Sequence, residues 1–179
     1  MFDPTIFENL KVVMEGAVYD LDLEGVILVV GRHDLVDMAD MSRAYVIRFR
    51  LKDGRCTGEL RLIAGLADLA GEKLEWKHAT PGCSLEIKFT LEMKETGSAC
   101  HLIQRELEAI WDHRPDIRQI VSYPYHADAG RERLFTNEIR CSFNRKIDEG
   151  HWSDFPELLD VMVDSLEALE THHAAGETG

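Results

Sequence analysis

The segment richest in reactive side chains is 123–133, Tyr-Pro-Tyr-His-Ala-Asp-Ala-Gly-Arg-Glu-Arg. Within it, Asp128 could orient His126 as a general base for proton transfer. The two arginines could bind an anion, because guanidinium groups form charge-assisted hydrogen bonds with carboxylates and phosphates. His126 and Asp128 are therefore the candidate catalytic pair. The candidate binding residues are Tyr125, Arg131 and Arg133.

This segment joins two predicted strands, 117–123 and 134–143, and is longer than an ordinary hairpin loop. Hairpin loops usually contain two to five residues, and long ordered loops often have a functional role. The preferred interpretation is a solvated loop whose tyrosines pack against the sheet and whose arginines pair with acidic neighbours. The loop is nevertheless the best candidate site that the sequence offers.

Three aspartates, Asp34, Asp37 and Asp40, follow His33 at a spacing of three residues. On a helix they would share one broad face, and clustered carboxylates suit Mg²⁺ or Mn²⁺. The sequence contains neither an H-E-x-x-H motif nor a calcium-binding loop, so nothing else supports a metal. The solvated side of an amphipathic helix is the preferred interpretation, and no metal is expected.

Two further patterns are weak signals of catalysis. Glu86-Ile87-Lys88 resembles half of a metal-dependent nuclease site, but any alternating strand with mixed surface charge produces this triplet. Cys100 and His101 are neighbours on a predicted helix, where successive side chains point about 100° apart. They cannot readily pair as nucleophile and base. Because the chain also lacks a nucleophile elbow, a P-loop and a dinucleotide fingerprint, we expect no cofactor.

The cysteines and the apolar runs indicate a cytoplasmic protein. The four cysteines show no C-x-x-C spacing, so free thiols in a reducing compartment are expected. The longest apolar run, 26–30, is far shorter than the roughly 20 residues that span a bilayer. The N-terminus has no signal-peptide pattern. We therefore expect no membrane association.

The net charge of −13 is concentrated at the two ends of the chain. Residues 1–40 contain nine acids and two bases, residues 151–179 contain seven acids and no lysine or arginine, and residues 41–150 are close to neutral. Such a field repels nucleic acid and anionic membrane, and it favours solubility or a basic partner. The acids on the polar side of the last predicted helix are Asp154, Glu157, Asp160, Asp164, Glu167 and Glu170.

The clearest predicted hairpin is 45–63, because its turn and its hydrophobic pattern agree. Asp53-Gly54 favours a type I′ turn, which requires positive φ at both residues. That turn pairs Arg48 with Glu59, Ile47 with Leu60 and Tyr45 with Leu62.

The other expected elements follow from periodicity. Residues 17–31 alternate around Gly25 and predict a hairpin whose second strand, 26–30, is covered on both faces. A short helix is expected over 33–41, and a second hairpin over 74–93 with its turn at Pro81-Gly82. Apolar stripes predict a central helix near 98–111, capped by Ser98, and a C-terminal helix near 154–170, capped by Ser153.

Together these elements predict an α+β protein with a mostly antiparallel sheet of about six to eight strands and helices on one face. Residues 1–171 are expected to form one domain, followed by a flexible tail over 172–179.

Three functions fit this sequence. The preferred one is a non-catalytic cytoplasmic binding or regulatory protein that self-associates through sheet edges or its acidic helix. The alternative is a small metal-dependent hydrolase or anion-binding enzyme that uses the 123–133 loop. The third is a small-ligand pocket between sheet and helix, for which an ordinary packed core is the simpler interpretation. Its lining would be Trp76, Phe89, Trp111 and Phe143.

Overall fold

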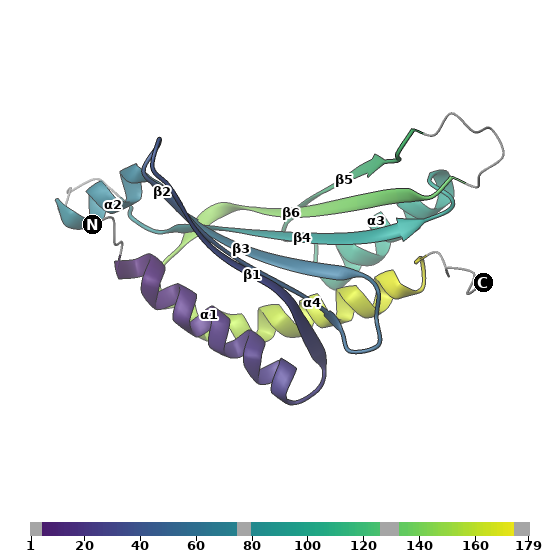
Figure 1. Cartoon of the computed structure of the whole chain (residues 1–179), viewed down its shortest axis with the longest axis horizontal. Helices are drawn as coiled ribbons and strands as arrows, with labels where there is room; N and C mark the ends of the chain where they lie inside the picture. The colour runs from purple at the N-terminus through teal and green to yellow at the C-terminus, as the bar shows by residue number, and fades with distance from the viewer. Residues whose placement is uncertain (1–4, 75–79, 126–132, 174–179) are drawn as a thin grey trace.

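A six-stranded antiparallel sheet runs through the part of the chain that the computed structural model describes, residues 5–74, 80–125 and 133–173. The strand order is β1-β2-β3-β4-β6-β5, so β1 and β5 are the edge strands (Figure 1). The predicted α+β class is confirmed, with six strands. The strands are β1 (Ile27–Asp37), β2 (Ser42–Leu51), β3 (Thr57–Ala64), β4 (Cys83–Met93), β5 (Asp116–Ser122) and β6 (Phe135–Ile147).

Three of the four described α-helices lie against one face of this sheet (Figure 1). The fourth, α2, is short and follows β3 directly. A 3₁₀ helix, η1, leads into α4. The helices are α1 (Thr5–Leu23), α2 (Leu66–Lys73), α3 (Gly97–Ile110), η1 (Glu149–Asp154) and α4 (Phe155–Glu170). No described helix is long and apolar enough to cross a membrane.

The hydrophobic core lies between the sheet and the helices. Strand β4 shows why: its alternate residues face the helices and are buried, while the residues between them lie on the opposite, open face. The helices contribute residues spaced by three and four positions, such as Ile103 and Leu107 on α3. The five inward residues of β4 are Leu85, Ile87, Phe89, Leu91 and Met93.

The predicted register of the β2–β3 hairpin is confirmed, but its turn is not type I′. Arg48 pairs with Glu59, as expected. Positive φ among the described residues occurs elsewhere, so neither Asp53 nor Gly54 adopts the conformation that a type I′ turn needs. A wider connection spans 52–56, and its Gly54 amide donates to the Leu51 carbonyl.

The N-terminal hairpin predicted over 17–31 is wrong. Its first strand belongs to α1, which buries Phe7, Leu10, Met14 and Val18 at helical spacing. The alternation over 17–24 coincides with the end of this longer helical stripe. Gly25 does supply the turn, with φ of 76°, but between a helix and a strand.

Residues 26–41 also differ from expectation. The run 26–30 was expected to be covered on both faces, yet it opens an edge strand on which Val30 is exposed. The helix predicted over 33–41 is wrong, because β1 continues to Asp37 and pairs with β2. A three-residue apolar spacing is too short a pattern to outweigh this long-range pairing.

The two predicted helices are confirmed, but their predicted N-caps are not. The helices expected near 98–111 and 154–170 are confirmed as α3 and α4. Neither predicted cap forms, because Ser98 already lies within α3, where its hydroxyl bonds Glu95, and Ser153 lies in η1. The first strand of the hairpin expected over 74–93 falls mostly outside the described residues, and β4 is its second strand. Within the predicted tail, the His172 ring lies 2.8 Å from Glu106.

Candidate functional site

The structure describes only part of the predicted site loop. His126, Asp128 and Arg131 lie outside the described residues, so their proposed catalytic and binding roles stay predictions. At the borders of this segment, the Arg133 guanidinium lies 5.4 Å above the Tyr123 ring, which in turn contacts Phe135. Tyr123 therefore contacts the sheet through Phe135 although it is 48 % exposed, and Tyr125 is 85 % exposed.

The three aspartates proposed for a metal do not share a helix face. Asp34 and Asp37 lie on β1, and Asp40 lies in the following turn. Asp37 and Asp40 each accept a hydrogen bond from a backbone amide two residues later. Among the described residues, no group of three histidine, cysteine or acidic side chains is placed to hold a metal ion.

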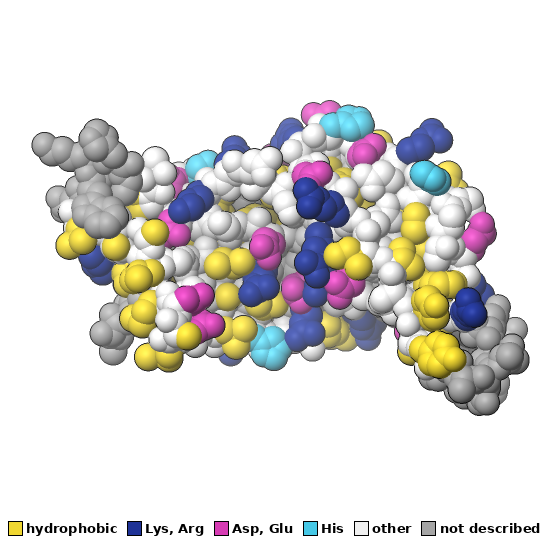
Figure 2. All heavy atoms as spheres, turned by 90° about the horizontal axis from the view of Figure 1, so that it is seen from above, with side chains coloured by type: hydrophobic (Ala, Val, Ile, Leu, Met, Phe, Trp, Pro, Cys, Tyr) yellow, Lys and Arg dark blue, Asp and Glu magenta, His cyan; other side chains and the backbone are white. Residues whose placement is uncertain are grey.

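The open face of the sheet carries mixed charges that are paired with one another. Figure 2 shows lysine and arginine side chains in a row across this face, beside acidic ones. Glu59 lies 3.7 Å from Arg48 and 3.4 Å from Lys88, and Glu86 lies 4.0 Å from Arg61. The Glu86-x-Lys88 triplet therefore belongs to a cross-strand charge ladder.

The described cysteines are not activated nucleophiles. All four are free, and burial raises the pKa of both Cys83 and Cys141 to about 12. Burial also raises the pKa of Cys100. Because the thiolate is the reactive form, these thiols are poor nucleophiles at neutral pH.

The outer edge of β1 is the first unusual surface. No described strand pairs with this edge, which runs along all eleven residues of β1. Large apolar side chains are exposed along it and its two ends, among them Leu35 at 50 % exposure. Proteins usually protect such an edge with charges, prolines or bulges, because it is a template for another strand. The exposed apolar residues are Val26, Leu28, Val30, Leu35, Val36 and Met38.

The charged residues of β1 that face the helices do not protect the edge, because α1 and β2 neutralise them. Arg32 forms an ion pair of 2.6 Å with Glu15 of α1. Asp34 lies 3.0 Å from Lys11 and 3.1 Å from Arg43. These charges are therefore directed toward the chain's own helix, and the outer edge keeps its apolar side chains.

Asp34→Asn tests this α1–β1 ion network. Burial alone would raise the pKa of Asp34, but hydrogen bonds from Lys11 and Arg43 outweigh it and hold that pKa below its ordinary value. The charged form thus stabilises the fold above the unfolded pKa of about 3.9, and this stabilisation is lost as pH falls through the lower folded pKa.

We expect Asp34→Asn to lower the free energy of unfolding at pH 7 by up to about 1 kcal/mol. When urea denaturation is repeated at decreasing pH, the difference between wild type and variant should vanish at the lowest pH values. Asp20→Asn, at an exposed position of α1, is the control. A loss that is constant across the pH range would contradict the ion-pair explanation.

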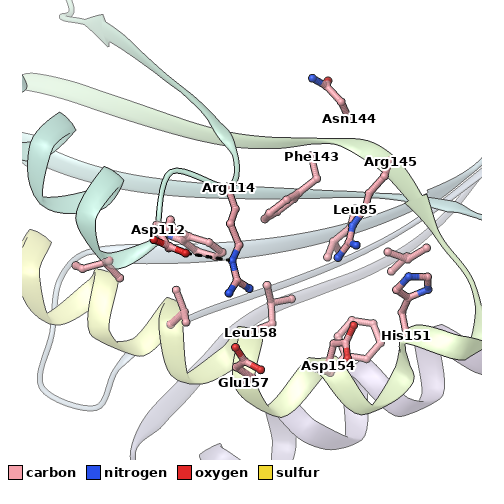
Figure 3. Close-up of a pocket in the computed structure, with 15 residues that line it drawn as sticks. Leu85, Asp112, Arg114, Phe143, Asn144, Arg145, His151, Asp154, Glu157 and Leu158 are labelled. Atoms are coloured by element: carbon pink, nitrogen blue, oxygen red, sulfur yellow. Dashed lines mark ion pairs between the residues drawn. The ribbon is translucent and has the colours of Figure 1, made fainter.

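The second unusual surface is a groove of about 830 Å³ between the sheet, the end of α3 and the start of α4 (Figure 3). Its floor is apolar and includes Leu85, Phe143 and Leu158. The Trp111 ring lies 5.9 Å from the Phe143 ring at 58°, a tilted aromatic pair. Trp111 donates from Nε1 to Ser165 Oγ at 3.0 Å, which fixes the indole.

Two arginines line the sheet side of this groove, where Asp112 lies 4.0 Å from Arg114, and two acids line the opposite side. Figure 3 shows Arg114 and Arg145 extending from the sheet side, while Asp154 and Glu157 project from the side of η1 and α4. The His151 ring, also at this rim, lies 2.9 Å from Asp148. The hydrogen bond with His151 and a backbone hydrogen bond from Gly150 lower the pKa of Asp148.

Sequence reasoning found only part of this groove. The sequence allows Trp111 and Phe143 as the lining of a pocket but favours a packed core, and both residues line this groove. Phe89 belongs to the core instead, and Trp76 lies outside the described residues. Arg114 and Arg145 were missed, because they come from separate segments and no local motif joins them.

Comparison of this chain with protein-family models, curated proteins and solved structures finds no match.

Proposed function

We propose that this chain is a non-catalytic cytoplasmic protein-binding protein that self-associates by pairing β1 with β1 of a second copy. The observation that supports this proposal is the apolar outer edge of β1, whose helix-facing charges are neutralised within the chain. The free thiols of Cys56, Cys83 and Cys141 support a reducing compartment.

Strand addition suits this edge because it satisfies exposed main-chain groups and buries apolar side chains in one step. A bulge between Val29 and Gly31 breaks the register with β2. Regular pairing with a second strand is therefore expected over 31–37, where Leu35 and Val36 are exposed. These side chains would provide the apolar part of the interface.

A second copy fits better than an unrelated acidic or basic partner. An edge rich in apolar side chains is complementary to itself, and a two-fold axis brings the same surface together from both chains. Among the described residues, Asp160, Asp164 and Glu167 are exposed acids without an ion pair, and they lie on α4. Self-association through β1 therefore need not bury them.

Leu35→Lys is the test of this interface. A lysine at the edge opposes strand addition, and a two-fold dimer contains the substitution twice. We expect the dimer dissociation constant to rise at least about tenfold. Sedimentation velocity across about 1–100 μM protein would measure it.

Leu102→Lys is the matched control, because Leu102 on α3 is 47 % exposed and lies away from the edge. This variant should associate like the wild type, and circular dichroism should show all variants folded. A wild type that stays monomeric at every concentration would overturn the proposal. So would a dimer that survives Leu35→Lys but dissociates on Ile120→Lys at the β5 edge.

A further inference from the structure

We propose that the groove between β6, the end of α3 and the start of α4 binds a small apolar molecule with an anionic group, such as an aromatic carboxylate or sulfonate. This site is separate from the β1 edge and does not rest on self-association. Its volume of about 830 Å³ lies in the range of small-molecule pockets, which span roughly 300–1,000 Å³.

The floor of the groove provides the apolar contact. Phe143 is half-buried beside the buried Trp111, so an aromatic ligand could pack against an existing aromatic pair. A residue of α4 fixes the indole: Ser165 Oγ accepts a hydrogen bond from Trp111 and donates one to the Val161 carbonyl at 2.7 Å. Because the indole is already held in place, it loses little conformational entropy when a ligand binds.

The sheet side of the groove provides the anion partner. Within the described residues, Arg145 has no ion pair or hydrogen bond, although three carboxylates, Asp112, Asp154 and Glu157, line the same groove. Arg114 has one ion pair, with Asp112 at 4.0 Å, and both side chains are largely exposed. Guanidinium groups that lack a close partner can bind a carboxylate or sulfonate at the cost of few existing contacts.

The segment that holds Arg114 is strained. Asp112 and His113 adopt φ of 50° and 54°, a left-handed conformation that non-glycine residues rarely take in succession. Hydrogen bonds from the His113 amide to Glu108 and from the Arg114 amide to Trp111 hold this turn. The strained turn places Arg114 at the rim of the groove rather than on the end of α3.

The opposite side sets the orientation of the ligand. Asp154 and Glu157 would repel an anionic group, so that group should lie at the arginine side and the apolar body over Phe143 and Leu158. His151, whose ring contacts Asp148, lies at the acidic end of the groove.

Two fluorescent probes with the same rings test this inference. 8-Anilinonaphthalene-1-sulfonate carries a sulfonate, and N-phenyl-1-naphthylamine is its neutral counterpart. We expect both to bind the wild type, and Arg114→Gln with Arg145→Gln to weaken the sulfonate probe about tenfold while changing the neutral probe less than about twofold. Phe143→Ala should weaken both probes.

Arg118→Gln, at an exposed arginine of β5 outside the groove, is the matched control and should leave both affinities unchanged. Leu35→Lys should also leave them unchanged, which separates this site from the β1 edge. The inference is overturned if neither probe binds below about 1 mM. It is also overturned if the two groove arginines have no effect, or if Arg118→Gln has the same effect.

Discussion

Phe7→Ala is expected to lower the free energy of unfolding by about 4 kcal/mol. Phe7 is fully buried on α1, and the Arg43 guanidinium lies 5.1 Å from the centre of its ring. Removing the ring leaves a cavity between α1 and the sheet and removes a cation–π contact. Urea denaturation followed by circular dichroism would measure the loss.

Val12→Ala is the control for this prediction, because Val12 lies on the same helix but is 63 % exposed. It should change stability by less than about 0.5 kcal/mol. If Phe7→Ala does not fold, Phe7→Leu keeps most of the volume and should show a smaller loss of the same sign. Equal effects at positions 7 and 12 would show that α1 does not pack as described.

Glu170→Ala is expected to cost about 3 kcal/mol, an unusual amount for a surface carboxylate. The Glu170 Oε1 atom accepts hydrogen bonds from the backbone amides of Arg55 at 2.6 Å and Cys56 at 2.7 Å. It thereby ties the end of α4 to the β2–β3 connection. Without it, two amides lose their acceptor beside the buried Cys56.

Thermal and urea denaturation would measure this loss, and hydrogen exchange at the Cys56 amide should accelerate. Glu167→Ala, at an exposed acid one turn earlier on α4, should be close to neutral. Glu170→Gln retains an oxygen acceptor and should lie between the two. A Glu170→Ala protein as stable as Glu167→Ala would refute the role of this carboxylate.

This carboxylate also lies close to Gly54, where the β2–β3 connection departs from the predicted turn. A Cβ atom on Gly54 would lie 2.6 Å from Glu170 Oε1 and 2.8 Å from the Leu51 Cβ atom. Glycine is therefore needed for the close approach of α4, not for positive φ. The dipeptide Asp53-Gly54 marks a connection correctly, and a residue more than a hundred positions away accepts hydrogen bonds from this connection.

The two candidate sites also differ in how much of each the sequence indicates. The sequence allows a Trp111–Phe143 pocket, because both residues lie at the apolar ends of predicted elements, but it favours a packed core. The edge at β1 could not, because 26–30 has the composition of a strand buried on both faces. Only the strand order shows that β1 has no described neighbour on its outer side.

The sequence by itself determined the α+β class, the register of β2 with β3, the alternation of β4, and the helices α3 and α4. In each of these, a pattern of at least three inward residues repeats with one period and is bounded by turn residues. It also determined that the negative charge lies at the two ends of the chain.

Only the tertiary structure decided that residues 17–23 continue a helix, that 33–37 extend an edge strand, and that two arginines line one groove with an aromatic floor. Short apolar patterns are compatible with either a helix or a strand, and contacts distant in sequence select between them. The acidic ends likewise acquire distinct roles through folding: Asp34 joins β1 to α1, Glu170 holds the β2–β3 connection, and Glu157 borders the groove.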